Sequence, residues 1–588
     1  MKQLKLTSSL LLATLLFACT GQRSASTTFD KNASTERAIS DLLSKMTLDE
    51  KIGQMTLFTT DWGSTGPTIR PGYEGDIRQG RCGALFNSHT AAFTRKLQKI
   101  AVEESRLKIP LLFGYDVIHG YKTIFPMPLG EAASWDLQAI EKAAEVAAAE
   151  ASAAGLHWTF APMCDVSRDP RWGRVMEGAG EDTYLGSEIA RARVRGFQGK
   201  SFENADRVLA CVKHYAGYGA PIAGRDYNVV DMTERTLREV YLPPYKAAVE
   251  EGAWTVMTSF NEIDGTPATA NSWLLEDVLR GEWKFKGMVV SDYTSVNEMV
   301  NHGNVANEKE AGEAALNAGL DMDMQGAVFQ NHLAKSVQEG KVKMVQIDEA
   351  VRRILRLKHQ LGLFENPYKY CDEERERRVV LSQANQDAAR DVARKSVVLL
   401  KNDNVLPLSK NLGSVAVIGP LADDKDQMIG AWSGAGEGQH CVTLLQGVRD
   451  KLGSSGKATV HYAKGCELTG DSRNGFADAI AAAKRSDVVI IAIGEHKDWS
   501  GEAACRADIT VPAIQEELVR QILTAGKPVV VVLMNGRPLV IPWLSENSPA
   551  LVEAWYLGTQ AGNALADVLF GDYNPSGKLP ITFPRHQG

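Results

Sequence analysis

Short β-rich runs alternate with helical stretches along most of this chain, and this alternation limits the possible folds more than any other feature. Helical stretches such as residues 137–154 and 234–251 separate runs rich in β-branched, aliphatic and aromatic residues. Strands that alternate with helices form parallel sheets, so eight of them predict a (β/α)8, TIM-like barrel over residues 36–364. The predicted strands are residues 52–57, 84–86, 111–113, 158–160, 208–212, 255–258, 288–290 and 320–322.

A second alternating region covers residues 389–588. Its predicted strands 488–493 and 529–534 are almost continuously apolar, which is typical of strands buried on both faces. With further strands at 415–418, 458–461 and 550–554 and helices at 476–484 and 514–524, the region predicts an open, mostly parallel α/β sandwich domain. Residues 365–388, which contain a charged run from Asp372 to Arg378, predict a solvated linker between the two domains.

The N-terminal segment has the pattern of a targeting sequence. Lys2 and Lys5 precede an apolar run from Leu10 to Ala18. A helix of this length rises about 13 Å, far less than the roughly 30 Å of a bilayer core, so residues 1–18 predict a secretory signal. Cys19 follows as in a lipoprotein signal, which predicts a lipid anchor and a flexible segment 19–35; a plain cleaved signal is the alternative. Both predict an extracytoplasmic protein, periplasmic or anchored to the outer membrane.

Composition excludes several functional classes. The 588 residues include 65 basic and 72 acidic side chains, a net charge of -7, so no basic surface for nucleic acid is expected. Histidine and cysteine spacings predict no zinc site, and the glycines 434, 436 and 438 do not form a dinucleotide-binding pattern. No cofactor or metal is therefore expected. The 8 cysteines are too few for a disulfide framework, and no pairing can be selected.

Polar side chains stand just after most of the predicted barrel strands. In a barrel of this kind the carboxyl ends of the strands share one face, where active sites are built. The alternative for each is a cap on the following helix. A repeated pattern favours a shared site, and its members are Asn87, Asp116, Asp165, Lys213, His214, Asn261, Asp292 and Asp323.

Two carboxylates from different domains are candidates for acid–base and nucleophilic chemistry. Asp292 ends the predicted strand 288–290, and Glu502 lies in a loop after the strand 488–493. Glu495 lies nearer the end of that strand and is a rival acid/base. Retaining glycoside hydrolysis uses two carboxyl groups about 5–5.5 Å apart, one as nucleophile and one as acid/base.

Six segments then occur in an order that resembles glycoside hydrolase family 3, in its periplasmic β-glucosidase branch. They are GYDVIHG at 114–120, DPRWGR at 169–174, KHY at 213–215, SDY at 291–293, GEA at 501–503 and GDYNPSGKLP at 571–580. The resemblance covers residues 36–588. It implies a retaining exo-acting hydrolase with Asp292 as nucleophile and Glu502 as acid/base. It also implies that the terminal sugar is held by four residues, Asp116, Arg174, Lys213 and His214.

Structural alternatives exist for the residues that the resemblance singles out. Lys213 and His214 could form strand-end ion pairs with Asp116 or Asp165, and Arg174 could pair with Glu177 or Glu181. Further candidate sugar contacts are Arg225, Trp499 and Tyr293, and Cys505 is a candidate free thiol or a buried structural cysteine.

The chain departs from its relatives at three places. The loop 215–219 lacks the histidine of the related N-acetylglucosaminidases, which disfavours that branch. Phe260 stands where many relatives have tyrosine. The sequence stops at Gly588, where close relatives continue into a domain of fibronectin III type, so that this domain is expected to be missing.

The leading hypothesis is a retaining exo-β-glucosidase that acts on the non-reducing end of oligosaccharides or glucosides. One alternative is a β-xylosidase or another exo-β-glycosidase of the same family. Another is a truncated, inactive glycan-binding lipoprotein. The sequence makes no prediction about oligomeric state.

Overall fold

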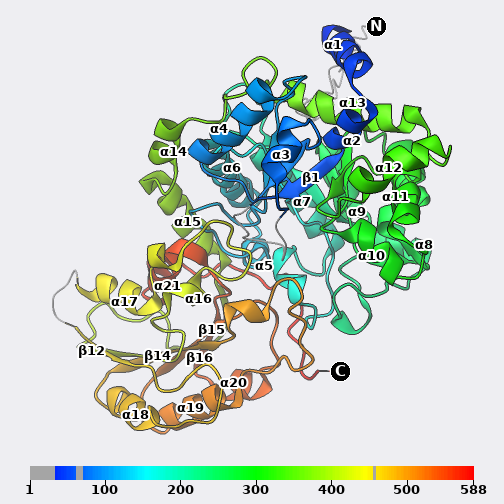
Figure 1. Cartoon of the computed structure of the whole chain (residues 1–588). Helices are drawn as coiled ribbons and strands as arrows, with labels where there is room; N and C mark the ends of the chain where they lie inside the picture. The colour runs from blue at the N-terminus through cyan, green and yellow to red at the C-terminus, as the bar shows by residue number, and fades with distance from the viewer. Residues whose placement is uncertain (1–32, 61–69, 454–457, 588) are drawn as a thin grey trace, which may run out of the picture.

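The computed structural model describes residues 33–60, 70–453 and 458–587. It consists of two lobes, a barrel coloured blue to green in Figure 1 and a sheet domain coloured yellow to red. The predicted signal segment 1–18, Cys19 and most of the segment 19–35 lie outside the described residues, so their predictions are not tested. Within the described residues, no helix is long and apolar enough to cross a membrane.

The first lobe confirms the predicted barrel. Its eight strands run parallel in two groups, β10-β1-β2-β3-β4 and β5-β6-β9. Parallel bridges between Trp158 and Leu209 and between Val290 and Met322 join the groups and close the ring. The strands are β1 Thr56–Thr59, β2 Ala84–Phe86, β3 Leu112–Tyr115, β4 Trp158–Thr159, β5 Cys211–Tyr215, β6 Thr255–Thr258, β9 Met288–Val290 and β10 Asp323–Met324.

Helices cover the outside of this barrel (Figure 1). The α-helices are α1 Ala33–Lys45, α2 Leu48–Gln54, α3 Tyr73–Arg78, α4 Ala91–Lys99, α5 Pro128–Ala133, α6 Leu137–Ala153, α7 Thr183–Gln198, α8 Glu234–Thr236, α9 Pro243–Glu250, α10 Ser295–Asn301, α11 Glu308–Asn317, α12 Val328–Gln338 and α13 Met344–Gln360. A short hairpin, β7 Glu262–Ile263 and β8 Thr266–Pro267, follows β6.

Several predicted elements of the barrel were wrong in detail. The strands predicted at 208–212 and 320–322 are displaced along the chain, to Cys211–Tyr215 and Asp323–Met324. The strand predicted at 52–57 is mostly helix α2, because Thr47 and Glu50 form a capping box that starts a helix there. The strand begins only at Thr56. The single helix predicted at 234–251 is divided, because Pro243 and Pro244 have no N–H to donate inside a helix; they start α9 instead.

The second lobe confirms the predicted α/β sandwich. Its sheet has the order β11-β16-β15-β14-β12-β13, and every pair is parallel except β11–β16. The strands are β11 Val398–Asn402, β12 Ser414–Ile418, β13 Thr459–Ala463, β14 Val488–Gly494, β15 Val529–Met534 and β16 Ala550–Glu553. The antiparallel strand β11 was not predicted, because its short apolar run, residues 397–400, directly follows a helical stretch that ends at Ser396.

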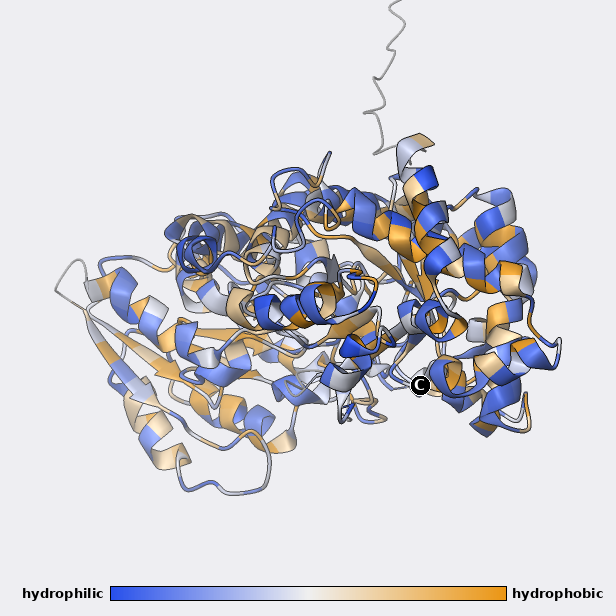
Figure 2. Ribbon diagram, turned by 45° about the horizontal axis from the view of Figure 1, so that its top comes forward, coloured by the Kyte–Doolittle hydropathy of each residue, from blue (hydrophilic) through white to orange (hydrophobic). Residues whose placement is uncertain are grey.

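Helices cover both faces of this sheet. Apolar residues of α17 Leu444–Gly453 and α21 Ala561–Leu569 pack on one face, and those of α18 Phe476–Lys484 and α19 Ala513–Leu523 pack on the other. Figure 2 shows the apolar strands inside and the hydrophilic helix faces outside. The short helices α16 Lys425–Met428 and α20 Pro542–Asn547 complete the domain.

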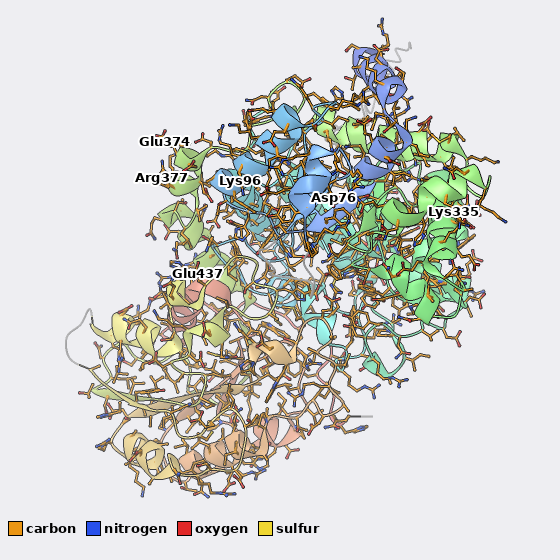
Figure 3. All side chains as sticks on the ribbon, in the orientation of Figure 1. Asp76, Lys96, Lys335, Glu374, Arg377 and Glu437 are labelled. Carbon is orange, nitrogen blue, oxygen red and sulfur yellow. The ribbon has the colours of Figure 1, made fainter. Side chains whose placement is uncertain are left out.

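The segment between the two domains is largely helical. Its charged run forms α14 Glu373–Val379, in which Glu374 and Arg377 are exposed and point away from the barrel (Figure 3). The following helix, α15 Gln383–Ser396, contacts barrel helices α5 and α6 and sandwich helix α21. The boundary predicted at residues 388–389 falls inside this helix, which ties the two domains together.

Candidate active site

A cavity of 470 Å³ lies at the mouth of the barrel, where the sandwich domain covers it. The barrel supplies Asp116, Arg174, Lys213 and Asp292 to its wall, and the sandwich domain supplies Glu502. Its other lining residues are Phe86, Phe160, Tyr227, Met257, Phe260, Tyr293, Thr294, Glu298, Met324, Trp432 and Ala503. Two carboxylates predicted from the sequence therefore share one cavity, although 210 positions separate them in the chain.

Asp292 follows β9, and the residue is 8% exposed. Its Oδ1 accepts a hydrogen bond of 2.7 Å from the backbone N–H of Tyr293, whereas Oδ2 is buried and makes no hydrogen bond to any described residue. Burial raises the pKa of Asp292; the charge of Arg174 opposes this rise and that of Glu502 adds to it. A buried oxygen without a partner marks a place that a substrate hydroxyl or water would complete.

Arg174 connects the groups around the cavity. It lies in the 3₁₀ helix Gly173–Glu177, and its buried guanidinium donates to both carboxylate oxygens of Glu177, at 2.8 and 3.0 Å. It also reaches His214 Nε2 at 2.8 Å and Glu502 Oε1 at 3.4 Å. The alternative pairing with Glu177 therefore exists, and Arg174 lines the cavity at the same time.

His214 is fully buried behind Arg174 and does not line the cavity. Because an arginine only donates, the Nε2 that faces Arg174 is the acceptor, and Nδ1 carries the proton that binds Asp165 at 2.9 Å. Burial, with the nearby charges of Arg174 and Lys213, lowers the pKa of His214 well below its usual value. The imidazole is therefore neutral, and Nε2 lies 3.6 Å from Asp292 Oδ2 without donating to it.

Lys213 and Asp116 form a buried ion pair that faces the cavity. The Nζ and Oδ1 atoms are 3.0 Å apart, and the side chains are 3% and 8% exposed. The ion pair considered for the strand ends is therefore present, and both partners still line the cavity. A cation and a carboxylate side by side offer a donor and an acceptor to neighbouring sugar hydroxyls.

Glu502 enters from the sandwich domain on the loop that follows the short helix Lys497–Trp499. The barrel residue Tyr227 donates its hydroxyl to Glu502 Oε1 at 2.8 Å. The next residue, Ala503, donates its N–H to Asp226 Oδ2 at 2.8 Å, and Asp226 Oδ1 accepts from the indole of Trp172. Barrel residues thus hold this loop directly over the cavity.

Glu495, the rival acid/base, lies elsewhere. It is fully buried and does not line the cavity. Its carboxylate pairs with Arg506 at 3.1 Å and with Arg537 at 3.4 Å. A carboxylate held between two guanidinium groups and away from the cavity is not in a position to protonate a substrate.

Of the other candidate residues, some line the cavity and others do not. Tyr293 and Phe260 line the cavity, whereas Arg225 is exposed and Trp499 stacks on Arg506 outside it. Cys505 is half-buried, and its sulfur accepts from the N–H of Asp226 at 3.0 Å. The strand-end residues Asn87, Asp165, Asn261 and Asp323 are buried but do not line the cavity.

Several lining residues were not predicted, and three of them bear on the chemistry of the site: Trp432, Tyr227 and Glu298. Trp432 lies in the glycine-containing loop after α16, and its ring is 5.5 Å from the Arg174 guanidinium and 5.3 Å from Lys213 Nζ. Tyr227 follows Asp226 in a loop without any catalytic pattern. Glu298 lies on α10; burial, and then the charge of Glu502, raise its pKa to about 7. An aromatic residue between glycines was the only sequence signal for any of them.

Comparison with known proteins identifies the family. Residues 47–357 match the N-terminal domain of glycosyl hydrolase family 3, and residues 397–588 match its C-terminal domain. The chain belongs to glycosyl hydrolase family 3. It is therefore a glycoside hydrolase of the β-glucosidase-like type, and the sequence-based recognition of the family is confirmed. Among the described residues, no group of three metal-ligating side chains forms a metal site.

Several relatives cover nearly the whole chain. A periplasmic β-glucosidase of Salmonella typhimurium is 44% identical, over 94% of this chain and 74% of its own. A β-xylosidase of Formosa agariphila is 36% identical, over 98% and 77%. The crystal structure of a β-glucosidase from Listeria innocua in complex with isofagomine superposes with a TM-score of 0.89 at 42% identity, over 94% of this chain and 76% of that one.

Proposed function

We propose that this protein is a retaining exo-β-glucosidase, which removes terminal β-D-glucosyl residues from the non-reducing ends of oligosaccharides or glucosides. The observation that carries the proposal is the shared cavity, in which Asp292 of the barrel and Glu502 of the sandwich domain both line the wall.

In the first step of the proposed double displacement, Asp292 attacks the anomeric carbon while Glu502 gives its proton to the glycosidic oxygen. The bond between that carbon and oxygen breaks, and a glucosyl ester of Asp292 forms. In the second step Glu502 takes a proton from water, which attacks the same carbon and releases Asp292. The free sugar then has the anomeric configuration of the substrate.

We assign the binding of the terminal sugar to the charged groups of the cavity wall. Asp116 accepts from sugar hydroxyls, and Lys213 and Arg174 donate to them through charge-assisted hydrogen bonds. His214 has an indirect role in this proposal: it keeps the Arg174 guanidinium oriented, and Asp165 holds its tautomer. The carbohydrate is the partner expected at this site.

The preference for glucose rests on the relatives. β-Glucosidases of Salmonella typhimurium and Listeria innocua are more similar to this chain than the β-xylosidase of Formosa agariphila, at 44% and 42% against 36% identity. A β-xylosidase is the second candidate, and a glycan-binding lipoprotein without activity is the third. Rates on a panel of aryl β-glycosides separate them, since only a glucosidase turns over the glucoside fastest and the binding protein turns over none.

The mechanism is tested by replacing the nucleophile and following the product. Asp292→Asn is expected to lose nearly all turnover of 4-nitrophenyl β-glucoside. Asp323→Asn is the matched control, because Asp323 is another buried strand-end carboxylate but caps Phe329 instead of lining the cavity. The wild type should release the β-anomer first, as seen by NMR. Release of the α-anomer, or full turnover by Asp292→Asn, rejects the proposal.

We further propose an extracytoplasmic location, in the periplasm or on a lipid anchor at Cys19. The name of the Salmonella typhimurium relative, a periplasmic β-glucosidase, supports the periplasmic part. Fractionation of cells, with labelled palmitate to detect a lipid, tests both parts. A Cys19→Ala variant that keeps its membrane association contradicts the anchor.

A further inference from the structure

Arg537 is a fully buried arginine in the loop after β15, outside the wall of the catalytic cavity. Its Nη1 donates to the backbone carbonyls of Pro170 and Arg171 in the barrel, at 3.0 and 3.1 Å. Its Nη2 donates to the carbonyls of Trp499 and Ala504 in the sandwich domain, the latter at 2.9 Å. One guanidinium therefore joins backbone from both domains.

These four carbonyls belong to the two segments that carry Glu502 and Arg174. Trp499 and Ala504 are the two ends of the short loop that carries Glu502. Pro170 and Arg171 directly precede the segment that carries Arg174, whose guanidinium lies 3.4 Å from Glu502. Arg537 thus fixes both ends of the loop that carries the carboxylate and connects them to the barrel segment beside it.

Glu495 orients the guanidinium. Its Oε1 atom lies 3.4 Å from Arg537 Nε, as an ion pair without a hydrogen bond, and also accepts a hydrogen bond from Arg506 at 3.1 Å. The backbone N–H of Gly536 lies 3.4 Å from the other oxygen. A rigid, planar guanidinium that is paired with a buried carboxylate presents its Nη donors in fixed directions.

From these contacts we infer that Arg537, oriented by Glu495, is a positioning residue that sets the place of Glu502 over the barrel. The inference rests on the proposed function, in which Glu502 is the acid/base. A displacement of about 1 Å in a reacting group can cost about 100-fold in rate, so two domains that meet at a catalytic site need such a connection. A lysine at this position keeps the charge but has only three N–H donors for the four carbonyls.

The test compares two substrates that differ only in their need for a proton. Cellobiose has a poor leaving group and depends on Glu502, whereas 2,4-dinitrophenyl β-glucoside has a leaving group that departs as an anion. Arg537→Lys is expected to lower kcat/KM for cellobiose about 100-fold. For the dinitrophenyl glucoside kcat/KM should stay close to the wild-type value, because Asp292 attack is unaffected.

Controls separate positioning from stability. Active sites are counted by covalent titration with a 2-deoxy-2-fluoroglucosyl inhibitor, which reports only correctly folded molecules that carry Asp292. Arg193→Lys is the matched control, because Arg193 is another buried arginine that pairs with Glu131 and donates to Ile118 at 2.8 Å, all within the barrel. In Arg193→Lys, kcat/KM for cellobiose and kcat/KM for the dinitrophenyl glucoside should change by the same factor.

If Arg537→Lys does not fold, the double variant Arg537→Gln with Glu495→Gln leaves no lone buried charge and is measured instead. If kcat/KM per titrated active site falls by the same factor for both substrates, the inference is overturned. Two other results overturn the proposed function instead. One is a Glu502→Ala variant whose kcat/KM falls equally for cellobiose and the dinitrophenyl glucoside, and the other is a wild-type protein that is inactive on both substrates.

Discussion

The guanidinium of Arg174 lies 3.4 Å from the carboxylate of Glu502, and the two residues belong to different domains. The same guanidinium donates to Glu177 and to His214, which lies beside Asp292. The two carboxylates assigned to catalysis are thus connected through a single buried cation. The barrel residues Glu177 and His214 hold that cation in place, whereas its contact with Glu502 depends on how the sandwich domain packs.

Arg174 has a structural and a substrate-binding contribution, which a pair of variants separates. Arg174→Met leaves Glu177 as an unpaired buried carboxylate, so we expect the free energy of unfolding to fall by about 3–5 kcal/mol. The double variant Arg174→Met with Glu177→Gln should recover most of that stability. Its kcat/KM should stay roughly 10–100-fold below wild type, because the charge-assisted hydrogen bond of about 1.5–3 kcal/mol to the substrate is still missing. Urea unfolding measures the free energy of unfolding, and glucoside kinetics measure kcat/KM. If the double variant recovers wild-type kcat/KM, Arg174 has a structural role only.

Gly173 is required by the close approach of the two domains. A Cβ atom at this position would lie 2.2 Å from the carbonyl oxygen of Gly501, next to Glu502. Gly173→Ala should therefore displace the Glu502 loop and lower kcat for cellobiose about 100-fold. Gly186→Ala is the control, because its Cβ would make an ordinary contact of 3.5 Å with Pro244 and helix α7 gains a better helix former. Wild-type kcat in Gly173→Ala contradicts the close approach.

The raised pKa of Asp292 predicts a pH-dependent stability. Burial, opposed by the charge of Arg174, raises this pKa from its ordinary 3.8 to about 8. The Asp292 carboxyl group therefore binds a proton more tightly in the folded protein than in the unfolded chain, and the ionised fraction is the one that acts as nucleophile. The free energy of unfolding due to this group therefore falls as pH rises from about 4 to about 8. Asp292→Asn removes the effect and should raise the melting temperature more at pH 8 than at pH 5, as measured by calorimetry. The exposed Asp277→Asn control should show no such difference.

Trp432 is expected to contribute to sugar binding from the sandwich side. Its ring faces Arg174 and Lys213 at 5.5 and 5.3 Å, which keeps both cations oriented in the cavity wall. Cation–π contacts of about 0.5–2 kcal/mol predict that Trp432→Ala raises the inhibition constant for glucose, by roughly 10-fold. Trp543→Ala is the control, because the Trp543 ring contacts the Arg520 guanidinium at 3.5 Å and does not line the cavity. Equal inhibition constants in both variants contradict this role.

The order of strands and helices was predictable where a segment carries its own signal. The continuous apolar run 529–534 is β15, and the predicted strands 84–86, 255–258 and 288–290 have the bounds that the structure gives them. Predictions failed where a contact with neighbouring residues competed with the pattern. Thr47 and Glu50 turned a predicted strand into helix α2, and the edge strand β11 was missed because its short apolar run directly follows helix α15.

The site could be predicted only in part. A carboxylate after a buried barrel strand, as at Asp292, is a strong candidate from position alone. Glu495 and Glu502 follow the same strand and looked equally suitable as acids until the family resemblance favoured Glu502. What distinguishes them is Arg537, which binds the Glu495 carboxylate from a position 42 residues further along the chain.

By itself, the sequence determined the alternation of strands and helices, the two-domain α/β class and the family, because apolar periodicity and short motifs are local properties. Only the tertiary structure decided which side chains meet in the cavity, which histidine tautomer faces Arg174, and which glutamate shares the cavity with Asp292. These depend on distances between residues hundreds of positions apart. Such distances are set by the packing of one domain on the other, which no local pattern records.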